Sequence, residues 1–309
     1  MRKIYYFFVK FWKSIRCICK PYIFTGQYTS NRNFGDALGI LIPKLLGVNN
    51  GQCMPKRYVF DWIYRRGTNI QMVGSTLGDI DENSILCGAG AVSAEQVVKN
   101  RPRKIISVRG PLTRELLIKQ GIDCPMVYGD PAMLLPLFYV HTYIHTYIHT
   151  YIHERQTECL KIGVIPHYVD KENELLKDLL RHPQCHLIDI LLSPNKMGKM
   201  SIDYEWKKWI DELCSYDAII SSSLHGLIIA EAYGIPTLWV KFSDEINGDD
   251  FKFYDYYASI GQSVSPLDLR EKEIGFEELQ GQITYKDTSI IDKKEYLQTL
   301  KMSIYEALS

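Results

Sequence analysis

The stretch Lys104–Gly121, KIISVRGPLTRELLIKQG, decides the fold class of this 309-residue chain. Its apolar start, Lys104–Val108, predicts a β-strand, because Ile and Val favour the pleated backbone. Pro111 in a first turn and Gly121 beyond a last turn predict a helix that runs through Lys119. A strand followed directly by a helix is the unit from which parallel sheets are built. The sequence therefore predicts an α/β protein.

The same alternation continues along the chain. Strands are predicted at residues 126–128, 161–165, 217–220 and 237–240, and helices at residues 172–181 (with Asp170 as N-cap), 202–215 and 224–233. A chain of 309 residues exceeds one ordinary core, so we expect two Rossmann-like domains. We place them at residues 1–138 and 157–309, with a linker at residues 139–156. The last helix is free to pack back on the N-terminal domain.

The linker contains the tetrapeptide His-Thr-Tyr-Ile three times, starting at His141. Histidines four residues apart would form a drifting stripe on a helix, which invites a metal site. Perfect repetition is more typical of tandem duplication in the coding DNA, which a spacer tolerates. His182, Cys185 and His186 also lie close together, but a fourth ligand at regular spacing does not follow them. The sequence therefore predicts no metal site and no cofactor.

Composition excludes several classes of protein. Lys plus Arg and Asp plus Glu number 36 each, so no net charge attracts nucleic acid. The eight cysteines are scattered without a CxxC pair, which is typical of reduced thiols in the cytoplasm. We interpret Ile4–Val9 as a first strand rather than an interfacial anchor. The basic residues after it predict a modest contact with the inner face of the cell membrane; they are Lys10, Lys13 and Arg16.

Two strand ends carry the strongest candidates for chemistry, because ligands of open α/β sheets bind beyond the carboxyl ends of the strands. Arg109 follows one predicted strand, where its guanidinium can bind a carboxylate or phosphate in two parallel hydrogen bonds. Its alternative role is a surface ion pair with Glu115 or Asp130. His225 follows Ser221–Ser223 at the start of a predicted helix, where it can donate a proton or bind phosphate. The next residue, Gly226, would let a ligand approach the backbone.

Other polar residues and glycines occupy similar positions. Asp36 lies in the first turn of a helix predicted after Asn33 and Gly35, either as a structural carboxylate or pointing into the cleft. Gly88 and Gly90 end another strand, where such loops often only turn the chain. The remaining candidates that follow strands are Asp130 and His167.

Taken together, these motifs resemble the polysaccharide pyruvyl transferases. The resemblance spans roughly residues 28–260 and rests on Asn-x-Gly-Asp, Ser-Val-Arg-Gly-Pro-Leu-Thr, Gly-Asp-Pro-Ala, Pro-His-Tyr, Ser-Ser-Ser-Leu-His-Gly-Leu-Ile and Gly-Ile-Pro, in that order. It implies two Rossmann-like domains facing a cleft, as in GT-B glycosyltransferases. It also implies transfer of pyruvate from phosphoenolpyruvate onto a sugar of a surface polysaccharide, or its lipid-linked precursor, as a cyclic ketal with release of phosphate.

The resemblance assigns roles to individual residues. It implies that Arg109 and His225 engage the donor and that Asp36 is the base or orients a hydroxyl. Some members carry an arginine two residues before the histidine, where this chain has Ser223. The donor would then be held by Arg109 with Ser222, Ser223, Leu224 and His225, aided by helix N–H groups or Lys252.

Two other functions stay open at this point. A GT-B glycosyltransferase using a nucleotide-sugar is favoured by Glu231, because Glu231–Pro236 resembles the element with which those enzymes hold their donors; otherwise Glu231 is a helix-surface carboxylate. The third function is non-catalytic glycan binding. Fold alone does not separate these classes.

Overall fold

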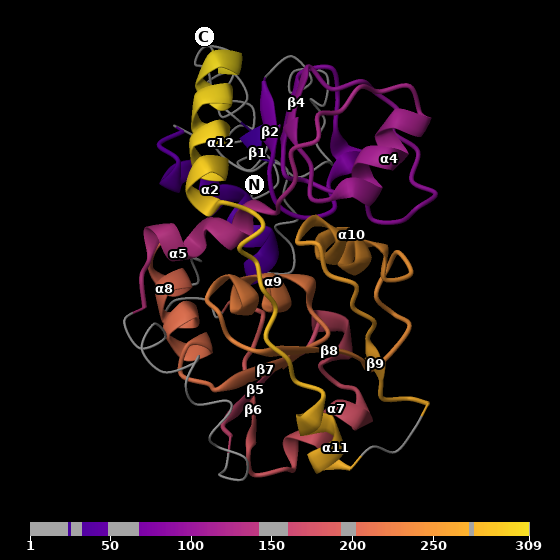
Figure 1. The fold of residues 1–309 in the computed structure, drawn as a ribbon, viewed down its shortest axis with the longest axis vertical. Helices are drawn as coiled ribbons and strands as arrows, with labels where there is room; N and C mark the ends of the chain where they lie inside the picture. The colour runs from indigo at the N-terminus through magenta and orange to yellow at the C-terminus, as the bar shows by residue number, and fades with distance from the viewer. Residues whose placement is uncertain are drawn as a thin grey trace, which may run out of the picture.

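The computed structural model describes residues 24–25, 33–48, 68–141, 160–192, 202–271 and 275–308; the side chains of residues 24–25 and 202–204 are outside this description. It contains two parallel β-sheets, which lie toward opposite ends of the long axis with α5, α9 and α10 between them (Figure 1). The predicted α/β class with parallel sheets is confirmed. The predicted strand at Ile4–Val9 and the repeats after His141 lie outside the described residues.

The N-terminal sheet has four parallel strands in the order β1-β2-β3-β4. They are β1 (Phe24–Thr25), β2 (Asn69–Gln71), β3 (Ser84–Cys87) and β4 (Lys104–Ser107). β2 and β3 are buried at every position, as expected of a sheet covered on both faces. The predicted helix after β4 is confirmed as α4 (Pro111–Lys119), which begins at Pro111 as its sequence indicates.

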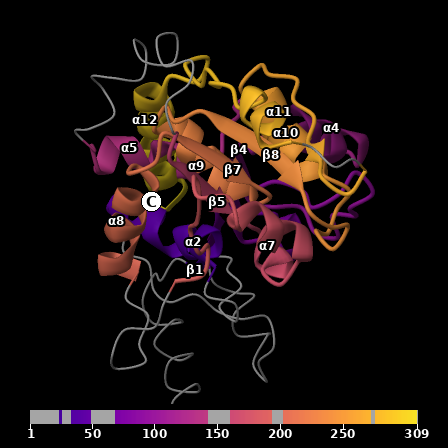
Figure 2. The same cartoon turned by 90° about the horizontal axis from the view of Figure 1, so that it is seen from below.

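The C-terminal sheet has five parallel strands in the order β6-β5-β7-β8-β9. They are β5 (Ile162–Ile165), β6 (Cys185–Leu187), β7 (Ala218–Ser221), β8 (Thr237–Lys241) and β9 (Leu267–Asp268). The helices of this half are α7 (Glu174–Leu180), α8 (Ile202–Leu213), α9 (Leu224–Ala232), α10 (Phe251–Ser259) and α11 (Phe276–Gly281). Seen from below, α7 and α11 lie on opposite sides of β5, β7 and β8 (Figure 2).

The layer between the sheets is built on α9, whose side chains are mostly apolar and almost all buried. Around it lie α2 (Phe34–Leu45), the short 3₁₀ helix η2 (Pro131–Leu134) and α5 (Leu135–Phe138). One apolar core joins these elements to both sheets. The last helix, α12 (Lys293–Leu308), packs against β3 and β4, so the chain returns to the N-terminal sheet.

Two local predictions were wrong. Residues 126–128 form no strand; Tyr128 makes one isolated parallel bridge to Val108. Asp170 does not cap the following helix, because α7 begins later and Asn173 caps it by accepting the Leu175 N–H at 2.9 Å. Asp170 instead ends a 3₁₀ turn, η3 (Tyr168–Asp170), and is buried.

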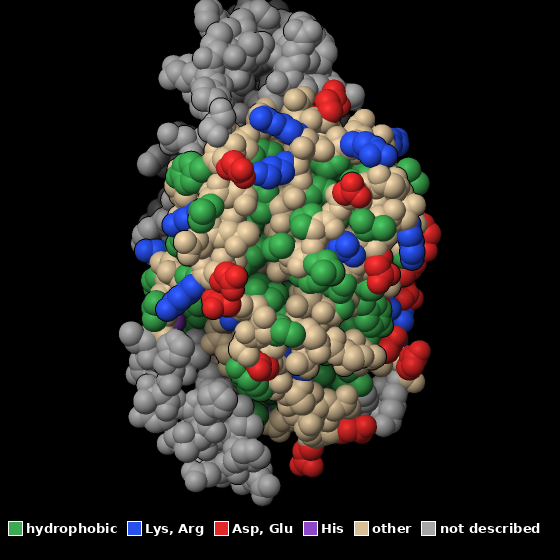
Figure 3. Space-filling view, turned by 45° about the horizontal axis from the view of Figure 1, so that its top comes forward, with side chains coloured by type: hydrophobic (Ala, Val, Ile, Leu, Met, Phe, Trp, Pro, Cys, Tyr) green, Lys and Arg blue, Asp and Glu red, His purple; other side chains and the backbone are tan. Residues whose placement is uncertain are grey.

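The described surface on one side of the molecule mixes charges of both signs with apolar side chains (Figure 3). Within the described ranges, no helix combines the length and the apolar character needed to cross a membrane.

Candidate active site

A cavity of about 430 Å³ lies between segments that follow strands of both sheets. This volume is within the range of small-molecule sites, roughly 300–1,000 Å³. Its lining includes Asn33, Asp36, Val73, Gly74, Ser75, Thr76, Gly78, Asp79, Val92, Gln96, His167, Tyr168, Val169, Ser223, Leu224, His225, Glu245, Asn247 and Lys252. The location agrees with the rule that ligands of α/β sheets bind beyond the carboxyl ends of strands.

The first turn of α9 forms one wall of the cavity, through Ser223, Leu224 and His225. A helix start presents unpaired backbone N–H groups and the positive end of the helix dipole to anions. Gly226 does not serve ligand approach: a Cβ there would lie 2.6 Å from Ser221 Oγ and 2.9 Å from Ile165 Cγ2. This glycine lets α9 pack closely on β5 and β7.

The first turn of α2 approaches the same place. Asn33 caps this helix by accepting the Gly35 N–H at 2.9 Å, and Asp36 follows in the first turn. A Cβ on Gly35 would lie only 2.1 Å from His225 Nδ1, so α2 and α9 meet with the imidazole packed against the glycine. The predicted helix after Asn33 is confirmed, and Asp36 lines the cavity.

Three titratable groups of the cavity have shifted pKa values. Burial raises the pKa of the Asp36 carboxyl to about 6, against the opposing effect of His225 and Lys252. Burial lowers the pKa of the Lys252 ammonium to about 8; Arg109 lowers it further, while Asp250, Asp36 and Asp170 raise it. Burial, Lys252 and then His225 lower the pKa of His167 to about 3. Such shifts are typical of functional sites, because uncompensated burial disfavours charge.

A buried carboxylate behind the cavity ties three of its walls together. Asp170 Oδ2 accepts the Ser222 hydroxyl at 2.7 Å, and Asp170 Oδ1 accepts the Ser243 hydroxyl at 2.5 Å. Ser222 Oγ also accepts the His167 N–H at 2.9 Å. The hydroxyl of Ser222 is therefore engaged inside the protein, and Ser222 does not line the cavity.

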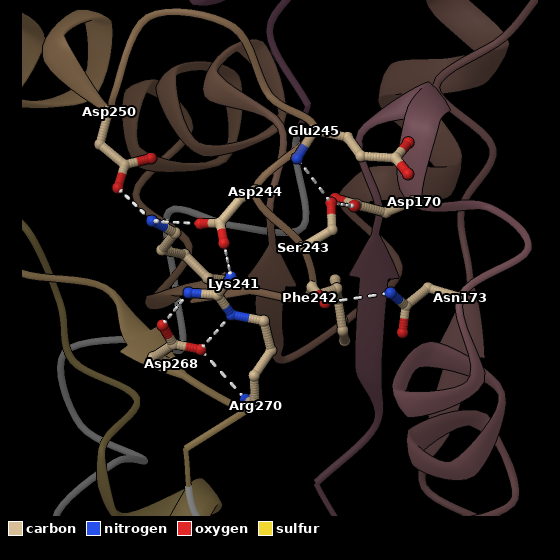
Figure 4. A network of polar contacts seen from close by, with 10 residues as sticks. All are labelled: Asp170, Asn173, Lys241, Phe242, Ser243, Asp244, Glu245, Asp250, Asp268 and Arg270. Atoms are coloured by element: carbon tan, nitrogen blue, oxygen red, sulfur yellow. Dashed lines mark hydrogen bonds and ion pairs between the residues drawn. The ribbon is translucent and has the colours of Figure 1, made fainter.

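The loop from β8 to α10, which carries Glu245 and Asn247 into the cavity wall, is held by ion pairs (Figure 4). Lys241 Nζ lies 2.8 Å from Asp250 Oδ2 and 3.7 Å from Asp244 Oδ1. Arg270 pairs with Asp244 and with Asp268. Further along the loop, a Cβ on Gly248 would lie 1.8 Å from the Val92 carbonyl oxygen, so glycine is required where this loop meets the N-terminal half.

Arg109 lies behind the cavity and does not line it. Its side chain is wholly buried, with Nε 3.0 Å from Asp255 Oδ2 and its other nitrogens donating to Ser75 Oγ (3.1 Å) and the Ala91 carbonyl (2.7 Å). The alternative of a surface ion pair with Glu115 or Asp130 is therefore wrong. Gly90 is required here, because a Cβ would lie 2.3 Å from the Arg109 guanidinium carbon.

The residues after Arg109 complete a docking contact for α10. Asp255 accepts the Thr113 N–H at 2.9 Å and the Thr113 hydroxyl at 2.6 Å, so it satisfies the start of α4 in place of an N-cap side chain. A Cβ on Gly110 would lie 1.9 Å from the Asp255 carbonyl oxygen. The motif Arg-Gly-Pro-Leu-Thr therefore seats α10, the helix that carries Lys252.

The other predicted residues lie outside the cavity lining. Gly88 is required against Pro131, whose Cδ would be 2.3 Å from an added Cβ. Glu231 is 1% exposed, not a surface carboxylate; it accepts hydroxyls from Thr237, Tyr256 and Tyr257 at 2.7–3.0 Å. Asp130 is wholly buried beside His225. The described residues contain no group of three or more His, Cys, Asp or Glu placed to hold a metal ion.

Sequence reasoning missed the segment after β2, which contributes Val73–Thr76, Gly78 and Asp79 to the cavity. The apolar run before Gly74 was the available signal, because it marks a strand end like the others. No comparable signal in the sequence marks the segment around Glu245 and Asn247. Its position in the cavity wall depends on ion pairs of the β8–α10 loop, which form only in the folded protein.

The two parallel sheets and the cavity beyond their strand ends define an α/β protein with a cavity of the size of a small-molecule site. The family model of polysaccharide pyruvyl transferases matches residues 61–244, more than half of the chain. The chain belongs to this family, which is a family of transferases.

A curated relative is an uncharacterized protein of Acanthamoeba polyphaga mimivirus. It is 29% identical over 198 residues, which cover 62% of this chain and 60% of the relative. The aligned part thus spans less than two thirds of that protein.

Proposed function

We propose that this chain transfers pyruvate from phosphoenolpyruvate onto a sugar of a surface polysaccharide or its lipid-linked precursor. The observation that carries the proposal is that the start of α9, Lys252 and two imidazoles surround one cavity with Asp36, in a chain of this family. Phosphoenolpyruvate carries a phosphate and a carboxylate, which helix N–H groups and an ammonium bind well. Two domains in a GT-B-like arrangement belong to the same proposal, with the donor and acceptor meeting between the sheets.

The reaction needs one proton donor and one proton acceptor. A proton is added to the methylene carbon of the donor, and a sugar hydroxyl, losing its proton, bonds to the adjacent carbon. A second hydroxyl then bonds to that carbon as the phosphate C–O bond breaks. Of the two hydroxyl protons, one balances the new methyl group and the other leaves with phosphate, so no redox partner or cofactor is needed.

Particular residues suit these steps. Lys252 and the first N–H groups of α9 bind the donor's anionic groups, and His225 binds phosphate and supplies the proton. Asp36, with a pKa of about 6, is mostly ionised at neutral pH and accepts the hydroxyl proton. Arg109 acts through α10, whose docking places Lys252, and through its hydrogen bond to the cavity residue Ser75.

The test is incubation of the full chain with phosphoenolpyruvate and candidate sugars, including lipid-linked ones. We expect phosphate release together with the mass gain of a pyruvyl ketal on the sugar. Thermal shift separates this function from its rival, because a ligand of the native state raises apparent stability. Stabilisation by a nucleotide-sugar and not by phosphoenolpyruvate would favour a glycosyltransferase. A peripheral contact with the inner face of the cell membrane is part of the proposal and is tested by sedimentation with anionic vesicles.

A further inference from the structure

Two buried polar atoms from different parts of the chain face each other beside the cavity. Asp130 Oδ2, at the start of η2, lies 3.7 Å from His225 Nε2, in the first turn of α9. Within the described ranges, neither atom has a hydrogen-bond partner. Buried polar atoms of native proteins almost always have one.

The two atoms are complementary. Asp130 Oδ1 already accepts the Ala132 N–H at 2.9 Å, which fixes the carboxylate and leaves Oδ2 directed at the imidazole. An ionised carboxylate can only accept hydrogen bonds, so the matching partner is an N–H at His225 Nε2. A separation of 3.7 Å exceeds the usual 2.7–3.2 Å, but catalytic hydrogen bonds are often long before the ligand binds and then shorten.

The opposite edge of the imidazole is equally constrained. Gly35 packs so closely that an added Cβ would lie 2.1 Å from Nδ1 and 2.6 Å from Cγ of His225. The ring is therefore held between α2 and η2. Because Nε2 is sealed inside the protein, only Nδ1 can meet a ligand in the cavity that His225 lines, and it can do so because Gly35 has no side chain to cover it.

We propose that Asp130 is a positioning residue that holds the proton of His225 on Nε2 and so presents Nδ1 to the cavity. The partner of one imidazole nitrogen sets what the other nitrogen can do. When Nδ1 is also protonated, the imidazolium donates that proton to the donor's methylene carbon and returns to the neutral Nε2–H form. The proton transfer by His225 rests on the proposed function. The position of the proton on Nε2 does not depend on that function.

The first experiment reads the tautomer without using the reaction. The full chain is labelled with ¹⁵N-histidine and its imidazole correlations are recorded at pH 8, with His225 assigned from its absence in His225→Gln. We expect the Nε2–H form in the unaltered chain. We expect the Nδ1–H form in Asp130→Asn, because the new amide donates to Nε2 while its oxygen still accepts the Ala132 N–H. An Nδ1–H form in the unaltered chain, or the same form in both, would overturn the proposal.

Asp130→Ser is the second variant. Its hydroxyl can still cap η2 but is too short to reach the imidazole, so the preference for Nε2–H should weaken. Retention of the full preference would count against the proposal. The signals of His182, whose ring stacks on Phe276 far along the chain, should be unchanged in both variants and serve as the control for folding.

The second readout is turnover with phosphoenolpyruvate. Asp130→Asn should lower kcat by about a hundredfold, with little change in the KM of the donor, because the imidazole still lines the cavity but the amide that donates to Nε2 keeps this nitrogen unprotonated, so the imidazolium that gives up the Nδ1 proton no longer forms. Unchanged kcat with a reversed tautomer would show that His225 does not transfer the proton. If the unaltered chain does not turn over, the proposed function fails while the tautomer result still decides the role of Asp130.

Discussion

Arg109 with Asp255 and Asp36 with Lys252 are two sets of charged groups in the same chain; the first is wholly buried and the second partly buried, and their partners differ. Arg109 and Asp255 are wholly buried and lie 3.0 Å apart, and their remaining polar atoms bond to Ser75, Ala91 and Thr113. Asp36 and Lys252 line the cavity, and burial shifts the pKa of each toward its neutral form. Fully paired buried charges are costly to separate, whereas charges that the protein leaves uncompensated are available to a ligand.

The largest expected effect is on stability, at the paired site. From its strand-end position alone, Arg109→Ala would be expected to leave the fold intact. The structure reverses this expectation, because the change leaves Asp255 buried without its cation. We expect a loss of about 3–5 kcal/mol in the free energy of unfolding, measured by urea titration. Lys104→Ala is the matched control: it breaks an exposed ion pair with Glu306 and should cost less than about 1 kcal/mol.

Asp36→Asn should have the opposite effect on stability. The folded-state pKa of Asp36 is raised, so its stabilising contribution is complete below about pH 4 and is lost as pH rises through about 6. The neutral amide removes that loss, which should raise the unfolding free energy by about 1–2 kcal/mol at pH 8 and leave it unchanged at pH 4. Turnover should fall about a hundredfold or more.

Asp123→Asn, on the exposed surface after α4, is the control for Asp36→Asn and should change stability by no more than about 0.5 kcal/mol. If Asp36→Asn were less stable than the unaltered chain at pH 8, Asp36 would be a structural carboxylate like Asp255.

Lys252→Arg tests the role of the cavity charges through the pH dependence of kcat/KM. If the ammonium binds the donor, activity falls as pH rises through its pKa of about 8. A guanidinium stays protonated up to about pH 12, so the alkaline fall in kcat/KM should move upward by at least about two pH units. Lys241→Arg is the control, because Lys241 pairs with Asp250 outside the cavity lining and should leave the fall near pH 8. A fall near pH 8 in both variants would remove Lys252 from donor binding.

The smallest effect on turnover is expected at Glu231. Its carboxylate accepts three hydroxyls inside the protein, so Glu231→Gln should cost about 1–2 kcal/mol in stability. Turnover should stay within about twofold, because the side chain does not line the cavity. A large loss of turnover with unchanged stability would restore the glycosyltransferase role of this residue.

Much of the fold could be predicted locally. The helix from Pro111 to Lys119, the helix after Asn33 and the strands on either side of α9 follow from apolar runs, proline and glycine. Residues 126–128 show the limit: their apolar pattern suits a strand, but only one bridge forms. Asp170 shows another, since a carboxylate before a helix resembles an N-cap until Ser222 and Ser243 compete for it.

The candidate site was predicted in outline, because strand ends and helix starts are visible in sequence. His225, Asp36, Asn33, His167 and Lys252 do line one cavity. Which of the strand-end residues reach that cavity was not predictable, because Arg109 and His225 both lie between a strand, β4 or β7, and the body of the following helix. Their different exposure depends on Asp255, far away in sequence, which pairs with one and not with the other.

The sequence by itself determined the family, the α/β class and the places where polar groups follow strands, since these depend on neighbours within a few residues. Only the tertiary structure decided that Arg109 docks α10, that Gly226 serves packing, and that Asp130 faces His225 across 3.7 Å. These outcomes depend on pairs of groups far apart in the chain. Burial makes each charge costly, and the presence or absence of a partner then determines whether that charge is neutralised inside the protein or left for a ligand.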